Sequence, residues 1–313
     1  MLGYKSLFSI TFPIVSCYND AKKITRYDLM SSLFPRTAVE GVSLPRMIMG
    51  INWLFGWSHT GPAADAGIKE RYQRPEDFFP VFKAYMDRGV DAILGPISNH
   101  SLGLAAIRYA EDKLGRGITI IDTPTLNVDD TRDARREAER AVRRSRETGA
   151  KFSLIFHASA EALVNKNTRS IPRLPDYLSM IRNEGMIPGL SAHMPELVTY
   201  SDANEYDVQT YIQIFNCMGF LMQIEVESVA RIIHEAKKPV IAIKPMAAGR
   251  CTPYVGLTFA YNAIRDCDMV CVGAGSALEV EEDIEISLAA IEHRFPNLAA
   301  RSSPVKQDIL GHK

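Results

Sequence analysis

The chain has 313 residues, of which 46% are hydrophobic and 23% are charged, and its formal net charge at pH 7 is -1. No basic tract accompanies this near-neutral charge, so nucleic-acid binding is not expected. No apolar run is long enough to span a membrane as a helix, and we expect a cytoplasmic protein with no membrane association. The length accommodates two ordinary domains or one large one, such as a barrel of about 250 residues.

The first 45 residues are predicted to be an irregular segment. Ile14-Val-Ser-Cys17 resembles a lipoprotein processing box, but Pro13 interrupts the apolar part and only one lysine precedes it, so we expect no export. Exposed apolar residues in this segment would suit contact with another protein, so a homo-oligomer is a possible assembly. The five cysteines form no CxxC pair and are expected to be reduced thiols rather than ligands of a zinc or iron–sulfur site.

Eight short apolar runs alternate with helical patterns along the rest of the chain. Such runs, without amphipathic period, are typical of strands buried on both faces. The predicted strands cover residues 46–50, 90–94, 118–121, 151–156, 187–190, 211–215, 240–243 and 269–272. The predicted helices cover residues 75–88, 101–114, 131–148, 174–184, a short piece from 195, 224–237, 252–266 and 279–293. Long loops are expected at 52–72 and 158–173.

This alternation predicts parallel strands joined by right-handed crossovers. Eight strand–helix units favour a closed (β/α)8 TIM barrel over an open doubly wound sheet. The loop after the first strand also lacks the GxGxxG pattern of the open-sheet dinucleotide fold. We therefore predict an irregular segment at 1–45, a barrel at 46–295 and a loosely attached tail at 296–313.

Polar residues follow most of the predicted strands. In such barrels the carboxyl ends of the strands meet at one end, which carries the active site. The residues expected to form a polar ring there are Asn52, Asn99 or His100, Asp122, His157, His193, Asn216, Lys244 and the Gly273–Ser276 loop. We interpret this ring as the binding site of a small-molecule substrate.

Three chemistries are open to this ring. Lys244 suits a Schiff base if desolvation lowers its pKa, or a fixed cation for a carboxylate or phosphate. His157 suits a proton donor to a carbonyl oxygen, because it needs only a pKa near neutrality. A metal on His157 and His193 is not expected, because no HxH pair and no carboxylate at a neighbouring strand end completes a ligand set.

Five segments in the second half of the chain resemble the aldo/keto reductase superfamily. They correspond to a strand that ends in histidine and to the GxSxH, DxxQxxYN, KPLAGG and GxSSxEELEEN patterns of that family. In this sequence they are Ser153–His157, Gly189–Met194, Asp207–Asn216, Ile243–Gly249 and Gly273–Asp283. The resemblance implies a TIM-barrel oxidoreductase that uses NADP or NAD.

The resemblance also implies positions for the cofactor and for one catalytic residue. In the family these strand-end loops hold the dinucleotide, which implies cofactor contacts at Gly249, Arg250, Gly273, Gly275, Ser276 and Glu282. Of the catalytic Asp, Tyr, Lys and His of the family, only the histidine carries over, as His157. Gly95 stands where the Asp is expected, no tyrosine follows it, the third strand ends in Asp122-Thr-Pro without a lysine, and Asp283 replaces the terminal Asn of the last pattern.

Three functions therefore remain open. The first is an oxidoreductase on a small carbonyl or sugar-like substrate, in which His157, with His193, Lys244 or Asn216, replaces the missing acid. The second is a lyase, aldolase or isomerase that needs no cofactor and uses Lys244 and His157. The third is a binding protein without catalysis, because a fold alone does not determine function.

Overall fold

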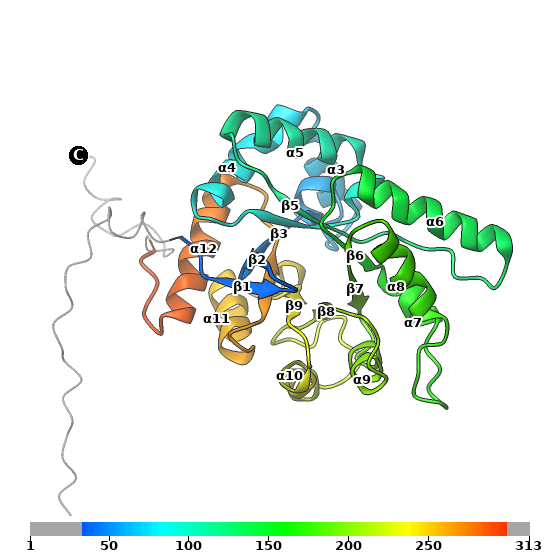
Figure 1. The fold of residues 1–313 in the computed structure, drawn as a ribbon. Helices are drawn as coiled ribbons and strands as arrows, with labels where there is room; N and C mark the ends of the chain where they lie inside the picture. Colours follow the sequence, from blue (N-terminus) through cyan, green and yellow to red (C-terminus); the bar gives the residue numbers. More distant parts are fainter. Residues whose placement is uncertain (1–32, 299–313) are drawn as a thin grey trace, which may run out of the picture. The chain divides into compact units, whose positions relative to one another are not determined.

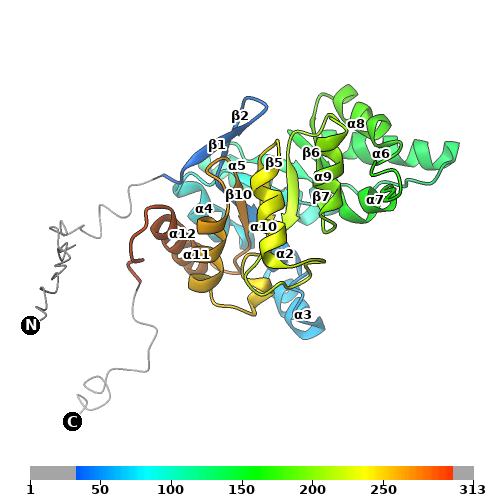
Figure 2. The same cartoon turned by 90° about the horizontal axis from the view of Figure 1, so that it is seen from below.

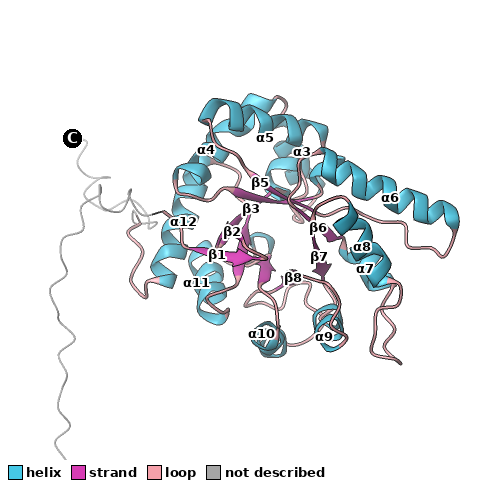
Figure 3. Ribbon diagram, in the orientation of Figure 1, coloured by secondary structure: helices cyan, strands magenta, loops and turns pink. Residues whose placement is uncertain are grey.

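The computed structural model describes residues 33–298, and eight parallel strands within them close into a barrel (Figures 1 and 3). The closing pair is the last strand against the first, with Val270 opposite Met47. The strands are β3 (Met47–Gly50), β4 (Ala92–Gly95), β5 (Thr119–Asp122), β6 (Phe152–Ile155), β7 (Ile187–Ala192), β8 (Tyr211–Ile214), β9 (Val240–Ile243) and β10 (Met269–Val272). The predicted TIM barrel is confirmed.

Helices surround this barrel in the alternating order that the sequence predicts (Figure 1). They are α4 (Phe79–Asp87), α5 (Ser101–Leu114), α6 (Arg132–Glu147), α8 (Leu174–Asn183), α9 (Glu196–Ala203), α10 (Val226–Glu235), α11 (Pro253–Ala263) and α12 (Ala277–Ile291). The expected helix at 75–88 is divided into a 3-10 turn, η1 (Pro75–Phe78), and α4.

The strands bury side chains on both sides, which explains their apolar sequences. In β9, Ile241 belongs to the cluster inside the barrel, whereas Val240 and Ala242 belong to the layer between strands and helices. Successive side chains of a strand point to opposite faces, so each strand contributes to both layers. The barrel interior is therefore packed with apolar groups, and it supports the polar residues at the strand ends.

A hairpin closes one end of the barrel. Strands β1 (Arg36–Val39) and β2 (Val42–Pro45) pair antiparallel around a turn in which Glu40 and Gly41 both have positive φ. This two-residue geometry matches the right-handed twist of short hairpins. Val39 and Leu44 are buried in the interior cluster of the barrel. Figure 2 shows the hairpin at the end of the barrel opposite to α2 and α3.

Three segments differ from the predictions. The region 36–45 was expected to be irregular and forms the hairpin. The expected loop at 52–72 contains α2 (Asn52–Phe55) and α3 (Pro62–Arg71), and the expected loop at 158–173 contains most of α7 (His157–Ala162). Helix α3 buries only Ile68, so its sequence has no apolar stripe to reveal it.

Residues 296–298 are irregular, as expected of the tail. The remainder of the tail and the segment around Cys17 lie outside the described residues. Within 33–298, no helix is long and apolar enough to cross a membrane.

The hairpin should contribute measurably to stability. Leu44 is fully buried (0% exposed), whereas Leu278 on α12 is 76% exposed. We expect Leu44→Ala to lower the free energy of unfolding by about 2–5 kcal/mol, because it removes buried methyl groups and leaves a cavity. The matched control Leu278→Ala should change it by less than about 0.5 kcal/mol. Urea denaturation measures both, and equal effects would show that the hairpin is not part of the cooperative core.

Candidate active site

A cavity of about 400 Å³ lies at the carboxyl ends of the strands. Its volume is within the range of about 300–1,000 Å³ that is usual for small-molecule sites. The polar side chains that line it belong to Asn52, Ser58, His59, Thr123, His157, Ser191, His193 and Lys244. Its apolar walls include Ile51, Trp53, Trp57, Leu94, Phe156, Ile212, Ile243 and Met246. No aspartate or glutamate is among the described residues that line this cavity.

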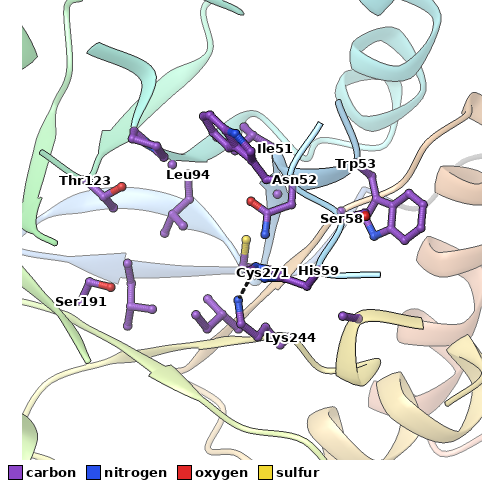
Figure 4. Close-up of a pocket in the computed structure, with 18 of the residues that line it drawn as sticks. Ile51, Asn52, Trp53, Ser58, His59, Leu94, Thr123, Ser191, Lys244 and Cys271 are labelled. Carbon is purple, nitrogen blue, oxygen red and sulfur yellow. Dashed lines mark hydrogen bonds between the residues drawn. The ribbon is translucent and has the colours of Figure 1, made fainter. Parts of the chain in front are cut away.

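Lys244 directly follows β9, and its amine lies in the cavity. The Lys244 Nζ atom is 3.1 Å from Nε2 of His59, and Figure 4 shows this contact beside Cys271 and Asn52. Burial lowers the pKa of the Lys244 amine, and the nearby Cys271 thiol opposes that shift. No aspartate or glutamate in residues 33–298 forms an ion pair with Lys244. The site therefore favours the neutral amine more than an exposed surface does.

The backbone of Lys244 supports a functional role for this residue. Its φ is +59°, in the left-handed region that side chains other than glycine rarely adopt. Such a conformation costs on the order of 1–3 kcal/mol and is enriched at functional sites, and nine other non-glycine residues of the described chain also have positive φ. The position is one at which local backbone preference alone would favour glycine.

His59 comes from the loop between α2 and α3 and was not predicted as a site residue. Burial lowers the pKa of His59, the nearby Lys244 lowers it further, and Asp65 opposes both effects. Asp65 holds the loop, because its Oδ1 accepts hydrogen bonds from the backbone N–H of Ser58 at 2.7 Å and from its hydroxyl at 2.6 Å. The long insertion after the first barrel strand was the available signal in the sequence.

His157 and His193 lie together, as the adjacent strand ends predict. His157 begins α7 after β6, and His193 follows β7. Their rings stack with centroids 3.7 Å apart and planes at 19°. Burial lowers the pKa of His193 to about 3, with further contributions from His157 and Lys244. Burial also lowers the pKa of His157, although Glu161 opposes this effect. Both rings are therefore neutral near pH 7.

Glu161 on α7 accompanies this pair and was not predicted. Its Oε1 accepts hydrogen bonds from the backbone N–H groups of His193 and Met194, both at 2.8 Å. Its Oε2 lies 3.9 Å from Nδ1 of His157. The sequence analysis considered carboxylates at strand ends, whereas the carboxylate beside the two histidines lies on a helix. The four-residue spacing from His157 to Glu161, which places both on one face of a helix, was the signal.

Three predicted ring members have structural roles outside the cavity lining. The buried Asn216 holds a turn, since its Oδ1 accepts from the backbone N–H groups of Met218 and Phe220. The buried Asp122 accepts hydrogen bonds from Ser98 N–H and the Ser145 hydroxyl. His100 caps α5 through Nδ1, which accepts from Gly103 N–H at 2.9 Å. A place at a strand end does not determine the direction in which the side chain points.

The six implied cofactor positions are not equivalent in the structure. Gly249 and Gly273 line the cavity. The Arg250 guanidinium lies 3.9 Å from the ring centroid of Phe220 and also donates to the carbonyl of Ala247. Glu282 is half-buried on α12.

Hydrogen bonds within the chain engage the backbone of Gly275 and the hydroxyl of Ser276. The buried Gly275 donates its N–H to Glu279 Oε2 at 2.6 Å, and its carbonyl accepts from Arg71 and the Tyr72 hydroxyl. Ser276 is the N-cap of α12 and accepts from the N–H of Glu279 at 3.3 Å. Ser276 therefore caps α12 through its hydroxyl, while the Glu279 carboxylate binds the N–H of Gly275, which precedes the cap.

Trp53 covers the same loop. A Cβ atom built on Gly273 would lie 3.5 Å from Cδ1 of Trp53, and one built on Gly275 would lie 4.0 Å from its Cε3. The space beside both glycines is therefore taken by an indole from α2. The insertion after β3 thus shapes this side of the cavity as well as supplying His59.

Comparison with known proteins finds similarity at the level of structure alone. No protein-family model matches the sequence, and no curated protein is similar to it in sequence. A protein from Pseudomonas aeruginosa described as an aldo-keto reductase superimposes with a TM-score of 0.60 at 13% identity, over 84% of this chain and 98% of that one.

Two further solved structures are similar over most of their length. The glycerol dehydrogenase of Gluconobacter oxydans gives a TM-score of 0.51 at 13% identity, over 86% of this chain and 99% of that one. An aldo/keto reductase from Klebsiella pneumoniae, solved with NADP and acetate, gives 0.50 at 14% identity, over 85% of this chain and 92% of that one. The chain therefore has a divergent aldo/keto reductase-like barrel, and identities this low indicate the fold rather than the reaction.

The loop that the resemblance assigns to the dinucleotide has one backbone donor, the N–H of Gly275, that is already engaged within the chain. A helix N-terminus binds phosphate through free N–H groups and a positive dipole end. Here the N–H of Gly275 is already bonded, the carboxylate of Glu279 adds negative charge, and Trp53 lies against the glycines. A phosphate would have to displace a charged group that stabilises the helix.

This arrangement predicts weak or absent dinucleotide binding. A cofactor with a Kd of about 10 μM would stabilise the fold by about 2.7 kcal/mol at about 1 mM. We expect neither NADPH nor NADH at that concentration to raise the melting temperature. Glu279→Gln keeps an acceptor and removes the charge, so it is the matched variant. Saturable stabilisation of the wild-type protein by either cofactor would contradict the assignment.

Asp283 occupies the position of the terminal Asn of the family pattern and lies in the core. It is 3% exposed, and burial, with a contribution from Glu279, raises the pKa of its carboxyl to about 8. The folded protein therefore holds a proton there that the unfolded chain, with an ordinary pKa of 3.8, releases. Stability must fall as the pH rises between these two values.

We expect this one group to lower the free energy of unfolding by at least about 1 kcal/mol between pH 5 and pH 8, because one pKa unit corresponds to about 1.4 kcal/mol. Asp283→Asn keeps the shape of the side chain and cannot ionise, so its stability should change less over that interval. Urea denaturation at the two pH values measures the difference. Parallel changes in both proteins would place the titration elsewhere.

Proposed function

We propose that the protein is an enzyme that binds a small carbonyl compound in the barrel cavity and exchanges a proton with it through Lys244. The observation that carries this proposal is the Lys244 amine, which lies in the cavity with a lowered pKa and without an acidic partner among the described residues. A lysine of this kind suits general base catalysis, because a lowered pKa makes its neutral form more accessible than that of an exposed lysine.

The chemistry would be the removal of a proton from the carbon next to the carbonyl group. The Lys244 nitrogen accepts the proton and becomes an ammonium ion. The electron pair of the C–H bond forms a carbon–carbon double bond, and the carbonyl electron pair moves onto the oxygen. The neutral rings of His157 and His193 each carry one N–H donor, and these suit the oxygen on which negative charge develops.

The cavity lining supports a small, electron-rich ligand. Its polar groups are neutral or basic, and no carboxylate among the described lining residues would repel an oxyanion. Apolar walls such as Trp57, Met246 and Ile212 suit the carbon skeleton of the compound. The substrate class that this lining favours is a small oxo acid or a sugar-like aldehyde or ketone.

The likeness to aldo/keto reductases suggests a second candidate, a nicotinamide-dependent reduction of the same class of carbonyl. The barrel and the position of His157 favour it. The capped start of α12 and the missing tyrosine of the family pattern weigh against it. Proton transfer needs only residues that line the cavity, and it is therefore the function we prefer.

Exchange of hydrogen for deuterium tests the proton transfer without knowledge of the complete reaction. Pyruvate, dihydroxyacetone and glycolaldehyde are incubated with the protein in D₂O, and proton NMR follows loss of the signal from the carbon next to the carbonyl. We expect the wild-type protein to accelerate exchange for at least one compound. Lys244→Met should lower that rate by about 100-fold or more, as expected for loss of a general base.

His234→Gln is a suitable control, since His234 is exposed on α10 outside the cavity. The rate for the wild-type protein should rise with pH as the amine loses its proton and should level off below pH 10.5, the ordinary pKa of lysine. No acceleration with any of the three compounds, or equal rates for wild type and Lys244→Met, would refute the proposal. A covalent adduct that forms between substrate and Lys244 on reduction with borohydride would show that Lys244 forms an imine and does not act as a general base.

A further inference from the structure

We propose that His157, His193 and Glu161 bind one divalent transition-metal ion of the Zn²⁺ type at the wall of the cavity. Both histidines also belong to the cavity lining, so the catalytic use of the ion rests on the proposed function, whereas its binding rests on the geometry of the three side chains.

The three side chains converge from two neighbouring strand–loop units. One ligand atom from each lies within 4.8 Å of those of the other two, and all three residues are half-buried. His157 and Glu161 are one helical turn apart on α7, and His193 follows the adjacent strand β7. Two imidazole nitrogens and one carboxylate oxygen form a ligand set that zinc and related first-row metals use in enzymes.

Glu161 is already held in an orientation that suits a ligand. Its Oε1 accepts the backbone N–H groups of His193 and Met194, which leaves Oε2 directed towards His157. Outer contacts of this kind fix the orientation of metal ligands in proteins. The same two hydrogen bonds tie α7 to the loop that carries His193, so the three ligands would move as a unit.

The ring nitrogens of His193 make no hydrogen bond with a described residue, although the ring is half-buried. The ring lines the cavity, so its nitrogens are accessible to a ligand that enters it. An ion in the cavity could therefore bind one of them. The two rings now stack at 3.7 Å with nearly parallel planes, so their lone pairs do not yet converge. Ligands of a tetrahedral zinc site lie roughly 3.4 Å apart, which requires the rings to rotate out of the stack.

Three protein ligands leave a fourth position open, as in catalytic rather than structural zinc sites. Because His157 and His193 line the cavity, that position would face the space in which we place the substrate. An ion there would act as a Lewis acid on the carbonyl oxygen, while Lys244 accepts the proton from the neighbouring carbon. The rings would then orient the ion instead of donating their own N–H groups to the oxygen.

Metal binding is tested on the full chain after dialysis against EDTA and removal of the chelator. Zn²⁺ alone is titrated by calorimetry, and Co²⁺ alone is titrated by visible absorption, which reports the coordination geometry. We expect one equivalent of each metal to bind to the wild-type protein. His193→Ala and Glu161→Gln should weaken binding by more than about 100-fold, beyond the effect typical of outer-shell residues.

His234→Ala and Glu235→Gln are the matched controls, because they remove an exposed imidazole and an exposed carboxylate at the end of α10, outside the cavity, and should bind as the wild type does. Far-UV circular dichroism and thermal unfolding without metal establish that each variant folds. Failure of the folded wild type to bind, or equal binding by Glu161→Gln, would overturn the proposal. No substrate is present, so this result is independent of the exchange assay with Lys244→Met.

Discussion

Closure of the barrel is the constraint on which the rest of the structure depends. The pairing of β10 with β3, with Cys271 between Ile48 and Ile243, joins the last strand to the first. Since all eight strands are parallel, closure brings their carboxyl ends to a single mouth. Residues from four separate parts of the chain, near positions 59, 157, 193 and 244, meet there only because the ring is complete.

The apolar interior determines the electrostatics of that mouth. Val39 and Leu44 of the hairpin belong to the interior cluster. Cys271 and Ile243 contact the same cluster and also line the cavity that contains Lys244. A lysine above such a layer loses solvation without gaining an acidic partner, and this lowers its pKa.

The sequence predicts the barrel well because parallel strands buried on both faces have a simple pattern. Each predicted strand overlaps the observed one, and α5 has the predicted bounds of Ser101–Leu114. The hairpin and α3 were missed because neither carries such a pattern: three of the eight residues in β1 and β2 are buried, and α3 is mostly exposed. A hydrophobic pattern in the sequence reflects which residues are buried, so elements that bury few residues are difficult to predict from it.

Site residues were predicted correctly where a barrel strand positions them and were missed where another element does. His157, His193 and Lys244 line the cavity because they follow strands whose ends are fixed by the barrel. Asn216 also follows a strand, but the turn after β8 uses its side chain. His59 and Glu161 were missed because a long insertion and a helix after the strand place them, and a survey of strand ends considers neither.

The left-handed backbone of Lys244 has a consequence for how this position is maintained. Glycine adopts that conformation without strain, so the residue that is best for folding there is not the residue that supplies an amine. Selection for stability alone would drive the position towards glycine. Under the proposed function the amine supplies an opposing pressure, so the identity of this residue across related barrels would test whether they share that function.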